Sequence, residues 1–465
     1  MNDGRGRGVG AERRASALAF ACGVVVLASA AVVASHAPAW QHTEVVLVAL
    51  GVGAVAWWGA VELARRGHGS IPLIVGVAIA LRALQLTSWP DLSDDVHRYV
   101  WEGELVARGV SPYAFSPDAV ELNALREELP EVAASLNHPE ISAAYPPVTQ
   151  AACAGVVTAA RALGVDAVLA LRVAFALCDL LVLVPLLALL RRAALPPALA
   201  VVWAWCPLVA LEFAGSGHFD SLGILLLLGA LALASRAAEA FIALPLAGAI
   251  LVKFLPVVAL PFLARDVAAR DGGIEGREAW QGRGRRLIAW TALLGAMAYA
   301  PLGLFDGGFR GLFAGLGEYG LRWQSSGLLH PYVAALCDTL FEQDGGPFDA
   351  RRVARGLLGL TWLGVLVLAW LRRYDAVRAT GILLGAFLLL TPTLHPWYVT
   401  WIVPFVALRP RAAWLWLVAT VPLAYAPLAA WKQEGVWEQP LWIRLAISIP
   451  LFVLLLWPTR TERRA

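Results

Sequence analysis

Residues 71–104 read IPLIVGVAIALRALQLTSWPDLSDDVHRYVWEGE and join one of the most apolar runs of the chain directly to one of its most polar segments. A helix needs about 17 to 25 consecutive apolar residues to cross the hydrocarbon of a bilayer. The run 71–88 meets that length, whereas the acids, bases and aromatic residues after it do not belong in lipid. The stretch therefore predicts a membrane helix that opens into a polar loop.

The composition of the whole chain extends this prediction. Of its 465 residues 59% are hydrophobic and 15% are charged, and its mean hydropathy is +0.66, above the usual range of soluble domains. Apolar runs of similar length recur along the sequence, and the alternating strands of a membrane barrel are absent from it. We expect an all-α polytopic membrane protein with about twelve transmembrane helices, forming a single domain over residues 1–465.

The arginines orient the predicted helices, because short cytoplasmic loops are enriched in arginine and lysine. Arginines precede the first apolar run, and we interpret residues 1–64 as two additional N-terminal helices, at 16–36 and 43–63, the first of them retained rather than cleaved as a signal peptide. With the N-terminus inside, residues 89–147 form a first long outer loop and residues 305–352 a second. The protein is then expected in the cell membrane, with the C-terminal TRTERRA inside.

Three further stretches have particular forms. A helix is expected at 195–211, leading to EFAGSGHFD on the outer side. Residues 148–163 are marginally apolar and suit a helix at the outer surface or a re-entrant one. The run 239–264 contains three prolines and has arginines at both ends, so a broken re-entrant element fits it better than a clean crossing.

The composition also disfavours several classes of function. The formal net charge is +3, and the arginines lie at the ends of apolar runs rather than in one patch, which speaks against nucleic-acid binding. No two of the five cysteines form a CxxC pair, so we predict neither a zinc site nor a disulfide framework. No P-loop or glycine-rich dinucleotide motif is present, which disfavours a nucleotide donor.

The polar segment after residue 88 carries the first candidate chemistry. Residues 93–108 predict a short helix that begins at a serine N-cap and ends before a glycine. The residues that share one face of this helix are Asp95, Arg98, Tyr99 and Glu102. A helix that lies in the membrane interface, with its acids at the favourable end of the helix dipole, would explain the pattern without any catalytic role.

A face with a base, a cation and a second acid also suits the transfer of a group from a phosphate-bearing donor. A carboxylate can take the proton from an attacking hydroxyl while an arginine neutralises the departing phosphate. The same set would serve equally as the ion gate of a transporter. The segments EFAGSGHFD and HPWY are expected to meet the two long outer loops on one face of the helix bundle, where an active site or a substrate gate would lie.

Other single residues are candidates for the same site. Lys253 is one of only two lysines in the chain, and a cation within an apolar run is costly, so we favour phosphate binding over a snorkelling lysine. His218 and Asp220 either bind substrate hydroxyls or a metal, or form an outer turn in which the aspartate caps the next helix. Glu212 either pairs with an arginine or takes part in the site, and His395 is either structural or part of the site.

The order of the residues after the third predicted helix resembles the first outer loop of the GT-C membrane glycosyltransferases, where the pattern D-E-x-R-Y occurs. Aligned on Arg98 and Tyr99, Asp95 takes the position of the catalytic acid, and Val96 stands where the family has its second acid. Asp94 supplies an acid on the other side. The resemblance therefore leaves either aspartate as the base.

The chain is similar in particular to one branch of that superfamily, the polyprenol-phosphate-mannose-dependent mannosyltransferases, with a layout like that of glycosylphosphatidylinositol mannosyltransferase I. The matching segments, spread over about residues 90–410, are DDVHRYVWEG, GVSPYAF, NHPEISAAYPP, the helix with Asp179, EFAGSGHFDSLG, VKFLP and HPWYVTWIVPF. Each segment is weak evidence alone, and their order together is specific. Phe219 and Phe254 depart from the residues usual in this branch without removing a titratable group.

The resemblance implies transfer of a mannosyl or related glycosyl group from a polyprenyl-phosphate donor to the hydroxyl of a lipid or glycan acceptor, on the outer face of the membrane and with inversion at the anomeric carbon. Asp95 or Asp94 would be the general base. The residues implied to bind substrate are Arg98, Tyr99, Glu102, His218, Asp220, Lys253 and His395. The partners expected are this donor, this acceptor and the membrane lipids.

Three alternatives stay open at this point. The expected donor requires no cofactor, although an acidic pair can bind a divalent metal. A pentose or an aminosugar can replace mannose, because donor choice depends on the shape of a pocket. A transporter or flippase of lipid-linked sugars would use the same outer residues without breaking a bond, and the inverted repeat that transporters often have is not evident in the sequence.

Overall fold

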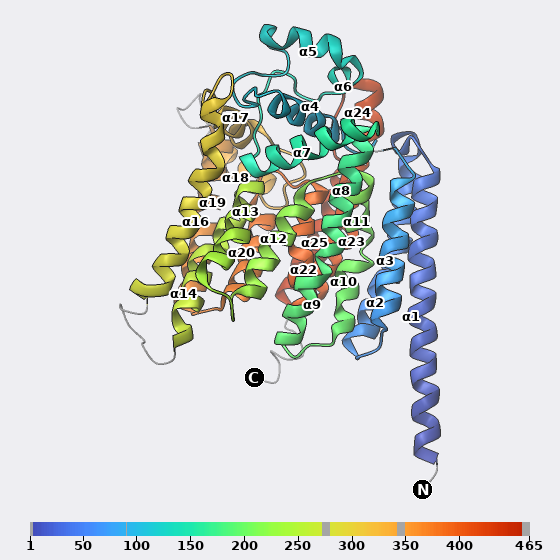
Figure 1. The fold of residues 1–465 in the computed structure, drawn as a ribbon. Coiled ribbons are helices and arrows are strands. Elements are labelled where there is room, and N and C mark those ends of the chain that lie inside the picture. The colour runs from blue at the N-terminus through green and yellow to red at the C-terminus, as the bar shows by residue number, and fades with distance from the viewer. Residues whose placement is uncertain (1–2, 90, 272–279, 342–348, 458–465) are drawn as a thin grey trace. The chain divides into compact units, whose positions relative to one another are not determined.

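The computed structural model of the chain describes residues 3–89, 91–271, 280–341 and 349–457 (Figure 1). Helices make up 77% of the structure, and no β-strand occurs in these ranges. The expected all-α class is thereby confirmed. The C-terminal TRTERRA, predicted to lie inside, falls outside the described residues, as does part of the basic loop 265–286.

Six helical stretches of the described chain are long and apolar enough to cross a membrane. They are Glu12–Ser35, Ala39–Arg65, Ala167–Arg192, Gly282–Leu304, Ala350–Leu371 and Ala412–Glu434. A bent pair of helices is a seventh candidate, and shorter apolar helices of 10–17 residues accompany them. The expected number of about twelve crossings stays a prediction.

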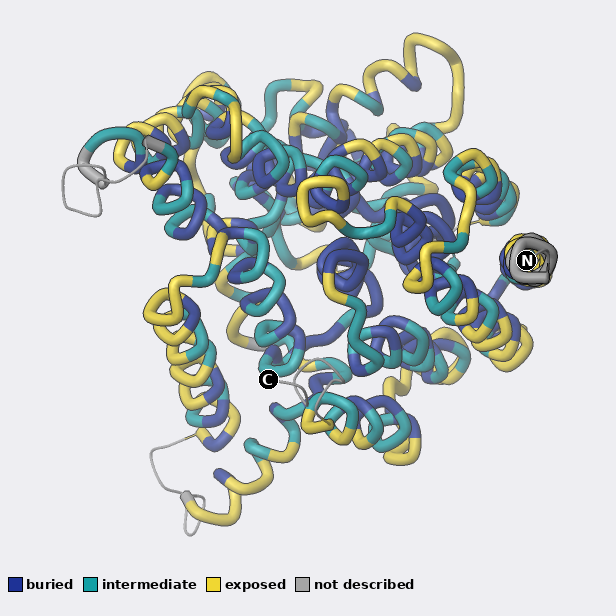
Figure 2. Tube along the Cα trace, turned by 90° about the horizontal axis from the view of Figure 1, so that it is seen from below, coloured by how far each residue is buried: buried dark blue, intermediate teal, exposed yellow. Residues whose placement is uncertain are grey.

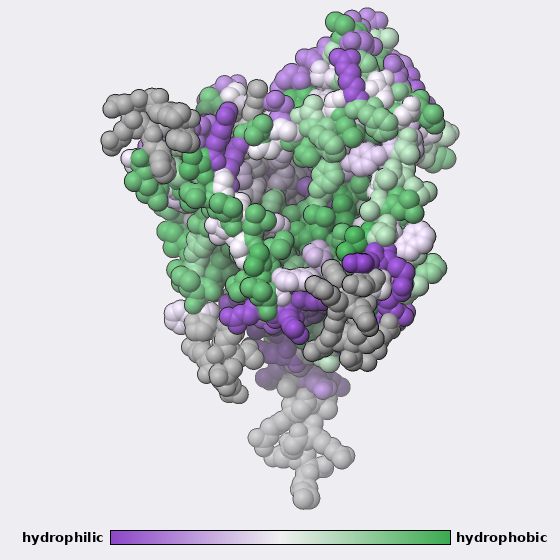
Figure 3. All heavy atoms as spheres, turned by 90° about the vertical axis from the view of Figure 1, so that its left-hand side faces the viewer, coloured by the Kyte–Doolittle hydropathy of each residue, from purple (hydrophilic) through white to green (hydrophobic). Residues whose placement is uncertain are grey.

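Apolar side chains cover the outside of several of these helices. In the stretch Ala350–Leu371, for example, Leu357, Leu360, Leu363 and Leu371 are all exposed. Figure 2 marks such exposed positions along the trace, and Figure 3 shows apolar side chains over much of the visible surface. Because soluble proteins rarely expose large apolar patches, these helices suit a lipid environment.

The Cα trace divides into two compact units. Unit 1 comprises Met1–Val96, Arg172–Ser221 and Val399–Ala465, and unit 2 comprises His97–Leu171 and Leu222–Tyr398. The expected single domain over the whole chain stays a prediction.

Unit 1 consists of helices from the three chain segments. They are α1 (Asp3–Ser35), η1 (Ala39–His42), α2 (Thr43–Arg65), α3 (Ile71–Leu86), the second half of α8 (Ala167–Leu181), α9 (Leu183–Arg192), η3 (Pro197–Ala200), α10 (Val201–Ala204), α11 (Pro207–Ala210), η4 (Leu211–Gly215), η9 (Thr400–Ile402), α22 (Val403–Leu408), α23 (Ala412–Thr420), η10 (Val421–Tyr425), α24 (Leu428–Glu434) and α25 (Leu441–Leu456). Helix α1 packs along α2 and α3, and α2 in turn contacts α10, α11 and α23.

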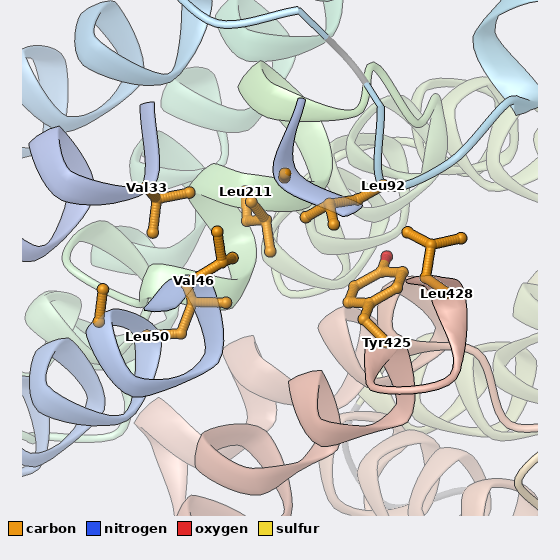
Figure 4. Close-up of a cluster of buried hydrophobic side chains, with 9 residues drawn as sticks. Val33, Val46, Leu50, Leu92, Leu211, Tyr425 and Leu428 are labelled. Carbon is orange, nitrogen blue, oxygen red and sulfur yellow. The ribbon is translucent and has the colours of Figure 1, made fainter. Parts of the chain in front are cut away.

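A cluster of buried apolar side chains joins the three segments of unit 1. Leu92 comes from the first segment, Leu211 from the second, and Tyr425 and Leu428 from the third. Figure 4 shows these side chains facing one another, together with valines and leucines of α1 and α2. The cluster therefore fixes the chain just before the acid pair against the C-terminal segment, because burial of apolar side chains is the main favourable contribution to folding.

The helix expected at 195–211 is broken. Helix α10 ends at Ala204, and the chain turns by 53° before α11 and the π-helical turn η4 continue it to Gly215. Pro207 explains the break, because proline has no N–H to donate and its ring clashes with the preceding turn. The predicted helix is therefore present as a bent pair, and the bend at this proline was not predicted.

Two buried arginines bind the backbone around the break. Arg82 on α3 forms an ion pair with Asp179 on α8, with 2.7 Å between Nε and Oδ2, and also donates to the carbonyl oxygen of Ala204. Arg172 donates to the carbonyl oxygen of Ala214, at 2.9 Å. Since the end of a helix leaves carbonyl groups without intrahelical partners, these guanidinium groups supply the missing donors.

Arg82→Met is expected to lower the free energy of unfolding by about 3 to 5 kcal/mol, because it leaves the Asp179 carboxylate as an uncompensated buried charge. The two side chains are only 2% and 0% exposed. Thermal unfolding of the purified protein in detergent measures the loss. Arg65→Met is the matched control, since Arg65 pairs with Glu62 at the surface and such pairs contribute little. Equal unfolding temperatures for Arg82→Met and wild type would contradict the structural role of Arg82.

Unit 2 contains most of the first predicted outer loop, the second predicted outer loop, and further helices from residues 147–171 and 222–398. Its elements are α4 (Asp95–Ala107), which begins in unit 1, η2 (Val120–Leu122), α5 (Asn123–Glu128), α6 (Pro130–Ala134), α7 (Pro147–Leu163), the first part of α8, most of α12 (Asp220–Leu233), α13 (Glu239–Val252), η5 (Leu255–Ala259), α14 (Leu260–Ala268), η6 (Ala269–Asp271), η7 (Trp280–Gly284), α16 (Arg285–Tyr299), η8 (Ala300–Leu304), α17 (Ala314–Arg322), α18 (His330–Phe341), α19 (Ala350–Leu371), α20 (Ala376–Leu390) and α21 (Pro396–Val399). Helix α13 packs against α7 and α16, and α19 packs against α18 and α20.

The run 239–264 is broken, as predicted. Helix α13 ends at Val252, Lys253 is extended with φ −155° and ψ 130°, and η5 then begins with Pro256 in its first turn. The residues 148–163 form α7, which is 17 residues long and is not among the helices apolar enough to be a candidate for crossing the membrane. That either element is re-entrant stays a prediction.

Candidate active site

Asp95 is the first residue of α4 and Asp94 immediately precedes the helix, so the acid pair lies at its N-terminal end, one residue earlier than predicted relative to the helix start. The backbone N–H of Asp95 donates to the hydroxyl oxygen of Ser93, at 3.4 Å. The helix ends at Ala107, and Gly109 follows with a φ of +74°, a conformation that favours glycine at the end of a helix. The carboxylates of the first turn lie at the end of the helix dipole that favours negative charge.

Asp94 forms an ion pair that the sequence did not suggest. Its two carboxylate oxygens both accept hydrogen bonds from the ammonium group of Lys432, at 2.9 Å and 2.8 Å. Lys432 lies on α24, in the C-terminal segment of unit 1. The side chains of Lys432 and Asp94 are 29% and 33% exposed. The charge of Asp94 is thus compensated at short range while the pair stays accessible to solvent.

A buried acidic cluster of unit 1 interacts with the charge of Asp95. Glu212 on η4 is fully buried, and its two oxygens accept from the hydroxyl of Tyr425 at 2.9 Å and 3.1 Å. The Nε2 atom of His218 lies 3.4 Å from a carboxylate oxygen of Glu212. Asp95 acts electrostatically on both Glu212 and Tyr425. The partners of Glu212 are therefore a tyrosine and a histidine, and not the arginine considered from the sequence.

Gly217 explains why the chain can bring this cluster close to the start of α4. Its φ is +77°, and a Cβ atom added there would lie 3.0 Å from the side chain of Arg172 and 3.1 Å from that of Val96. A larger residue would therefore separate the turn from Val96, the residue after Asp95. Gly217, the second glycine of the EFAGSGHFD segment, therefore has a packing role, which the sequence pattern alone did not reveal.

Asp220 begins α12 and is fully buried. One of its carboxylate oxygens accepts from the indole N–H of Trp401, a residue of the HPWYVTWIVPF segment. His218 is equally buried. The structure thus places both predicted substrate ligands in unit 1, in a polar interior that Trp401 helps to order. Their predicted role in binding substrate hydroxyls stays a prediction.

A small pocket, open to solvent, lies in unit 1 beside η4. Its lining includes Gln85, Ser88, Asp91, Leu211 and Ser216. None of the residues predicted to form the site lines this pocket. The pocket lets water reach the residues around η4, and its lining adds no candidate catalytic or binding residue.

Arg98 is largely engaged in binding the first outer loop within unit 2. Its Nε donates to Glu102 at 2.9 Å, Nη1 donates to the carbonyl oxygens of Asn137 and His138 at 3.2 Å and 3.0 Å, and Nη2 donates to that of Ile141. A guanidinium group has five N–H donors. In this conformation Arg98 can therefore offer at most one of them to a phosphate, which excludes a bidentate grip.

Glu102 connects α4 to α7, and Tyr99 connects it to Tyr145, two residues before α7 begins. The second oxygen of Glu102 accepts from the amide of Gln150 on α7, at 2.7 Å. The ring of Tyr99 packs edge-on against that of Tyr145, with 6.2 Å between ring centres. Both side chains are almost completely buried. These contacts are structural, and the predicted contact of Glu102 and Tyr99 with substrate stays a prediction.

Lys253 stands directly after the C-terminal end of α13, where the helix dipole favours a cation. The hydroxyl of Thr149 donates to the carbonyl oxygen of Val252, at 2.7 Å, and so fixes the backbone beside it. The ammonium nitrogen lies 4.1 Å from the ring centre of Tyr398 and 6.0 Å from that of Tyr145. Aromatic faces stabilise a cation where water is scarce.

His395 lies in the loop before α21, beside the lysine. Its ring stacks on Trp397 at 4.3 Å and meets Tyr398 edge-on at 5.3 Å. Removal from water, together with the charge of Lys253, lowers the pKa of His395 to about 3. The imidazole is therefore neutral at physiological pH, so that it can exchange hydrogen bonds with hydroxyl groups and does not neutralise a phosphate.

The neutral His395 predicts an acid-sensitive stability. Its folded-state pKa lies below the ordinary value of about 6.5, so between about pH 6.5 and pH 3 the unfolded chain binds more protons at this group than the folded chain, by up to one proton. The stabilisation is complete above pH 6.5 and decreases as the pH falls through that window. Thermal unfolding at pH 7.5 and at pH 5 should show a smaller acid loss for His395→Asn than for wild type, and equal losses would contradict the prediction.

The second predicted outer loop is bonded to the HPWY segment within unit 2. The backbone N–H of Ser325 donates to the carbonyl oxygen of Pro392 at 3.3 Å, and that of Leu394 donates to Ser325 at 2.7 Å. The hydroxyl groups of Tyr319 and Tyr398 share a hydrogen bond. The loop therefore helps to fix the ring of Tyr398 that faces Lys253.

The predicted site residues thus form one group in each unit. Unit 1 holds Asp94, Asp95, His218 and Asp220, and unit 2 holds Arg98, Tyr99, Glu102, Lys253 and His395. The expected convergence of the outer segments on one face stays a prediction. In the described part of the chain no group of three or more histidines, cysteines or acids is arranged to hold a metal ion, so no residue is assigned to a metal.

Two residues of the unit 1 group, Lys432 and Tyr425, were missed by the sequence analysis. Lys253 was chosen because lysine is rare in this chain, and the same argument applies to Lys432. This rarity is the one sequence signal that would have identified Lys432. Tyr425 carries no such signal, because its partner Glu212 lies 213 residues away in the sequence.

Carboxylates at a polar helix end and a lysine held among aromatic rings, in an all-α membrane protein, suit either an enzyme that transfers a group beside the bilayer or a transporter. The comparisons with known proteins define the class further. The model of the alpha-(1->6)-mannopyranosyltransferase (MptA/B) family, N-terminal domain, matches residues 8–269, more than half of the chain, and the chain belongs to this family. Glycosyl transfer between a sugar donor and an acceptor is the activity that this membership supports. Comparison with curated proteins and with solved structures gives no match.

Proposed function

We propose that the protein is a GT-C glycosyltransferase that transfers a mannosyl group from a polyprenyl-phosphate donor to an acceptor hydroxyl on the extracytoplasmic side of the cell membrane, as part of building the cell envelope. The observation that carries the proposal is the acid pair at the start of α4, in a chain of the mannopyranosyltransferase family. The family name describes an α-(1→6) linkage. The acceptor proposed is therefore the 6-hydroxyl of a mannosyl residue on a lipid or glycan.

The base proposed is Asp95. It occupies the position of the catalytic acid in the resemblance to the GT-C enzymes.

The reaction is proposed as a single displacement. Asp95 takes the proton of the acceptor hydroxyl, and the oxygen forms a bond to the anomeric carbon. The bond from that carbon to the phosphate oxygen breaks, and its electron pair leaves with the polyprenyl phosphate. A single displacement inverts the anomeric carbon, so an α-linked product requires a β-linked mannosyl phosphate.

The phosphate group is assigned to Lys253. Its position at the end of α13 and the aromatic rings around it support a cation that can meet an anionic lipid head group at the end of an apolar helix. Arg98, the phosphate ligand expected from the sequence, is proposed to act mainly by holding residues 137–141, with one remaining N–H for the substrate. The neutral His395 is proposed to bind sugar hydroxyls beside the lysine. No step is assigned to a metal.

The proposal is tested with the purified wild-type protein in liposomes that contain radiolabelled β-mannosyl polyprenyl phosphate and an α-mannoside acceptor. Formation of an α-(1→6)-linked product, identified by linkage-specific mannosidase digestion, is the expected result. Retention of the β configuration in the product would contradict the single displacement. Movement of the labelled lipid between the leaflets, with no product in either the presence or the absence of acceptor, would favour a flippase instead.

A further inference from the structure

A short C-terminal segment of unit 1 supplies a partner to each of two acids in that unit. Tyr425, at the end of η10, donates to Glu212, and Lys432, on α24, donates to Asp94. Both residues lie well beyond residue 269, where the match to the family's N-terminal domain ends. Two acids of the matched region, Asp94 and Glu212, thus bind side chains that lie outside it.

The packing of this segment fixes Lys432 with respect to the acid pair. Leu428, one turn before Lys432 on α24, is buried in the same cluster as Leu92, which precedes Asp94 by two residues (Figure 4). Tyr425 belongs to the same cluster. The short distances between Lys432 and Asp94 therefore rest on a packed apolar base, and not on two freely moving surface side chains.

We propose that Lys432 is a positioning residue that holds the carboxylate of Asp94, so that Asp95 alone of the two adjacent aspartates receives the proton of the acceptor. The inference rests on the proposed function and deepens it, because it names the ion pair that gives the two aspartates different roles. Two adjacent carboxylates without a cation repel each other, and one of them tends to hold a proton. The ammonium group of Lys432 binds both oxygens of Asp94, and its positive charge offsets the repulsion between the two carboxylates.

Other charged and titratable groups of unit 1 act on the two aspartates. Asp91 interacts electrostatically with both Asp94 and Lys432. Glu212 and Tyr425 interact electrostatically with Asp95. Lys432 is a cation whose bond to Asp94 the structure shows, so its loss removes the positive charge bound to Asp94.

The role is expected to appear in kinetics and pH dependence more than in stability. With side chains 29% and 33% exposed, the Lys432–Asp94 pair is of the kind that contributes little to folding. Lys432→Met should therefore leave the unfolding temperature close to that of wild type. Its glycosyl transfer should fall by about 5- to 10-fold, and the acid limb of its pH profile should move upward by about one pH unit, because the unpaired acids take up a proton more readily.

Four variants test this inference in the liposome assay: Lys432→Met, Lys432→Arg, Asp94→Asn and the double variant Asp94→Asn/Lys432→Met. Lys432→Arg should restore both the rate and the acid limb, since it keeps the charge. In the Asp94→Asn background Lys432→Met should cause no further loss. A second 5- to 10-fold loss in that background, or an acid limb unmoved in Lys432→Met, would overturn the inference.

A chemical readout separates this inference from the proposed function. The chain has only two lysines, so acetylation by acetic anhydride followed by peptide mass spectrometry reports Lys432 and Lys253 individually. Asp94→Asn should increase the acetylation rate of Lys432 several-fold and leave that of Lys253 unchanged. An unchanged rate at Lys432 would overturn the pairing on which the inference stands, whereas a wild-type protein that transfers no sugar would overturn the proposed function.

Discussion

Asp95→Asn is expected to lower the rate of glycosyl transfer by about 100- to 10,000-fold, the range that a general base typically contributes. The amide has nearly the shape of the carboxylate and cannot accept the proton of the acceptor hydroxyl. The affinity for the polyprenyl-phosphate donor should change little, because the phosphate is assigned to Lys253. Measurement of kcat and of KM for the donor with the protein in liposomes distinguishes the two effects.

Two controls make the result specific. Asp338→Asn removes an exposed carboxylate on α18 and should leave transfer unchanged. Asp94→Asn should reduce transfer by much less than Asp95→Asn, because Asp94 is bound to Lys432 and is not assigned the proton. If Asp94→Asn proved the more damaging of the two, with Asp95→Asn close to wild type, the assignment of the base would be reversed.

The positions of the helices were largely predictable, because the apolar character and the start of a helix are set by residues close together in the sequence. The apolar runs predicted as helices at 16–36 and 43–63 correspond to helices that the structure shows as candidate membrane spans. The start of α4 was predictable for the same reason, since a serine followed by two aspartates is a local signal for the beginning of a helix. The break before Pro207 was also a local signal, and it was missed because hydropathy outweighed it.

The partners of the site residues were not predictable, because they are distant in the sequence. Lys432 lies 338 residues from Asp94, and Arg98 donates to carbonyl groups about 40 residues further along the chain. Backbone carbonyls in particular leave no trace in a sequence pattern, since every residue carries one. The side chain of Arg98 was recognised as important, but its structural role in folding residues 137–141 was visible only from the geometry.

Lys253→Gln is expected to lower kcat/KM for the donor by about 10- to 100-fold. A hydrogen bond to a charged group contributes about 1.5 to 3 kcal/mol, and each 1.4 kcal/mol corresponds to about a factor of ten. Lys253→Arg should recover part of the loss, because it restores the charge but not the compact shape of an ammonium group. Polyprenyl phosphate without a sugar should inhibit wild type competitively and inhibit Lys253→Gln much less, since the phosphate contact remains in the product.

The same measurements decide how the lysine acts. If Lys253 binds the phosphate equally in the donor and in the transition state, KM and the inhibition constant rise together and kcat stays constant; if it acts only on the charge that develops as the phosphate leaves, kcat falls alone. The ring of Tyr398, 4.1 Å from the ammonium, favours the first outcome, because a cation already held in place before the reaction contacts the phosphate of the bound donor. Tyr398→Leu should then raise KM in the same direction as Lys253→Gln, and Tyr398→Phe, which keeps the ring, should do so much less. Unchanged kcat and KM in Lys253→Gln would leave the phosphate to another residue.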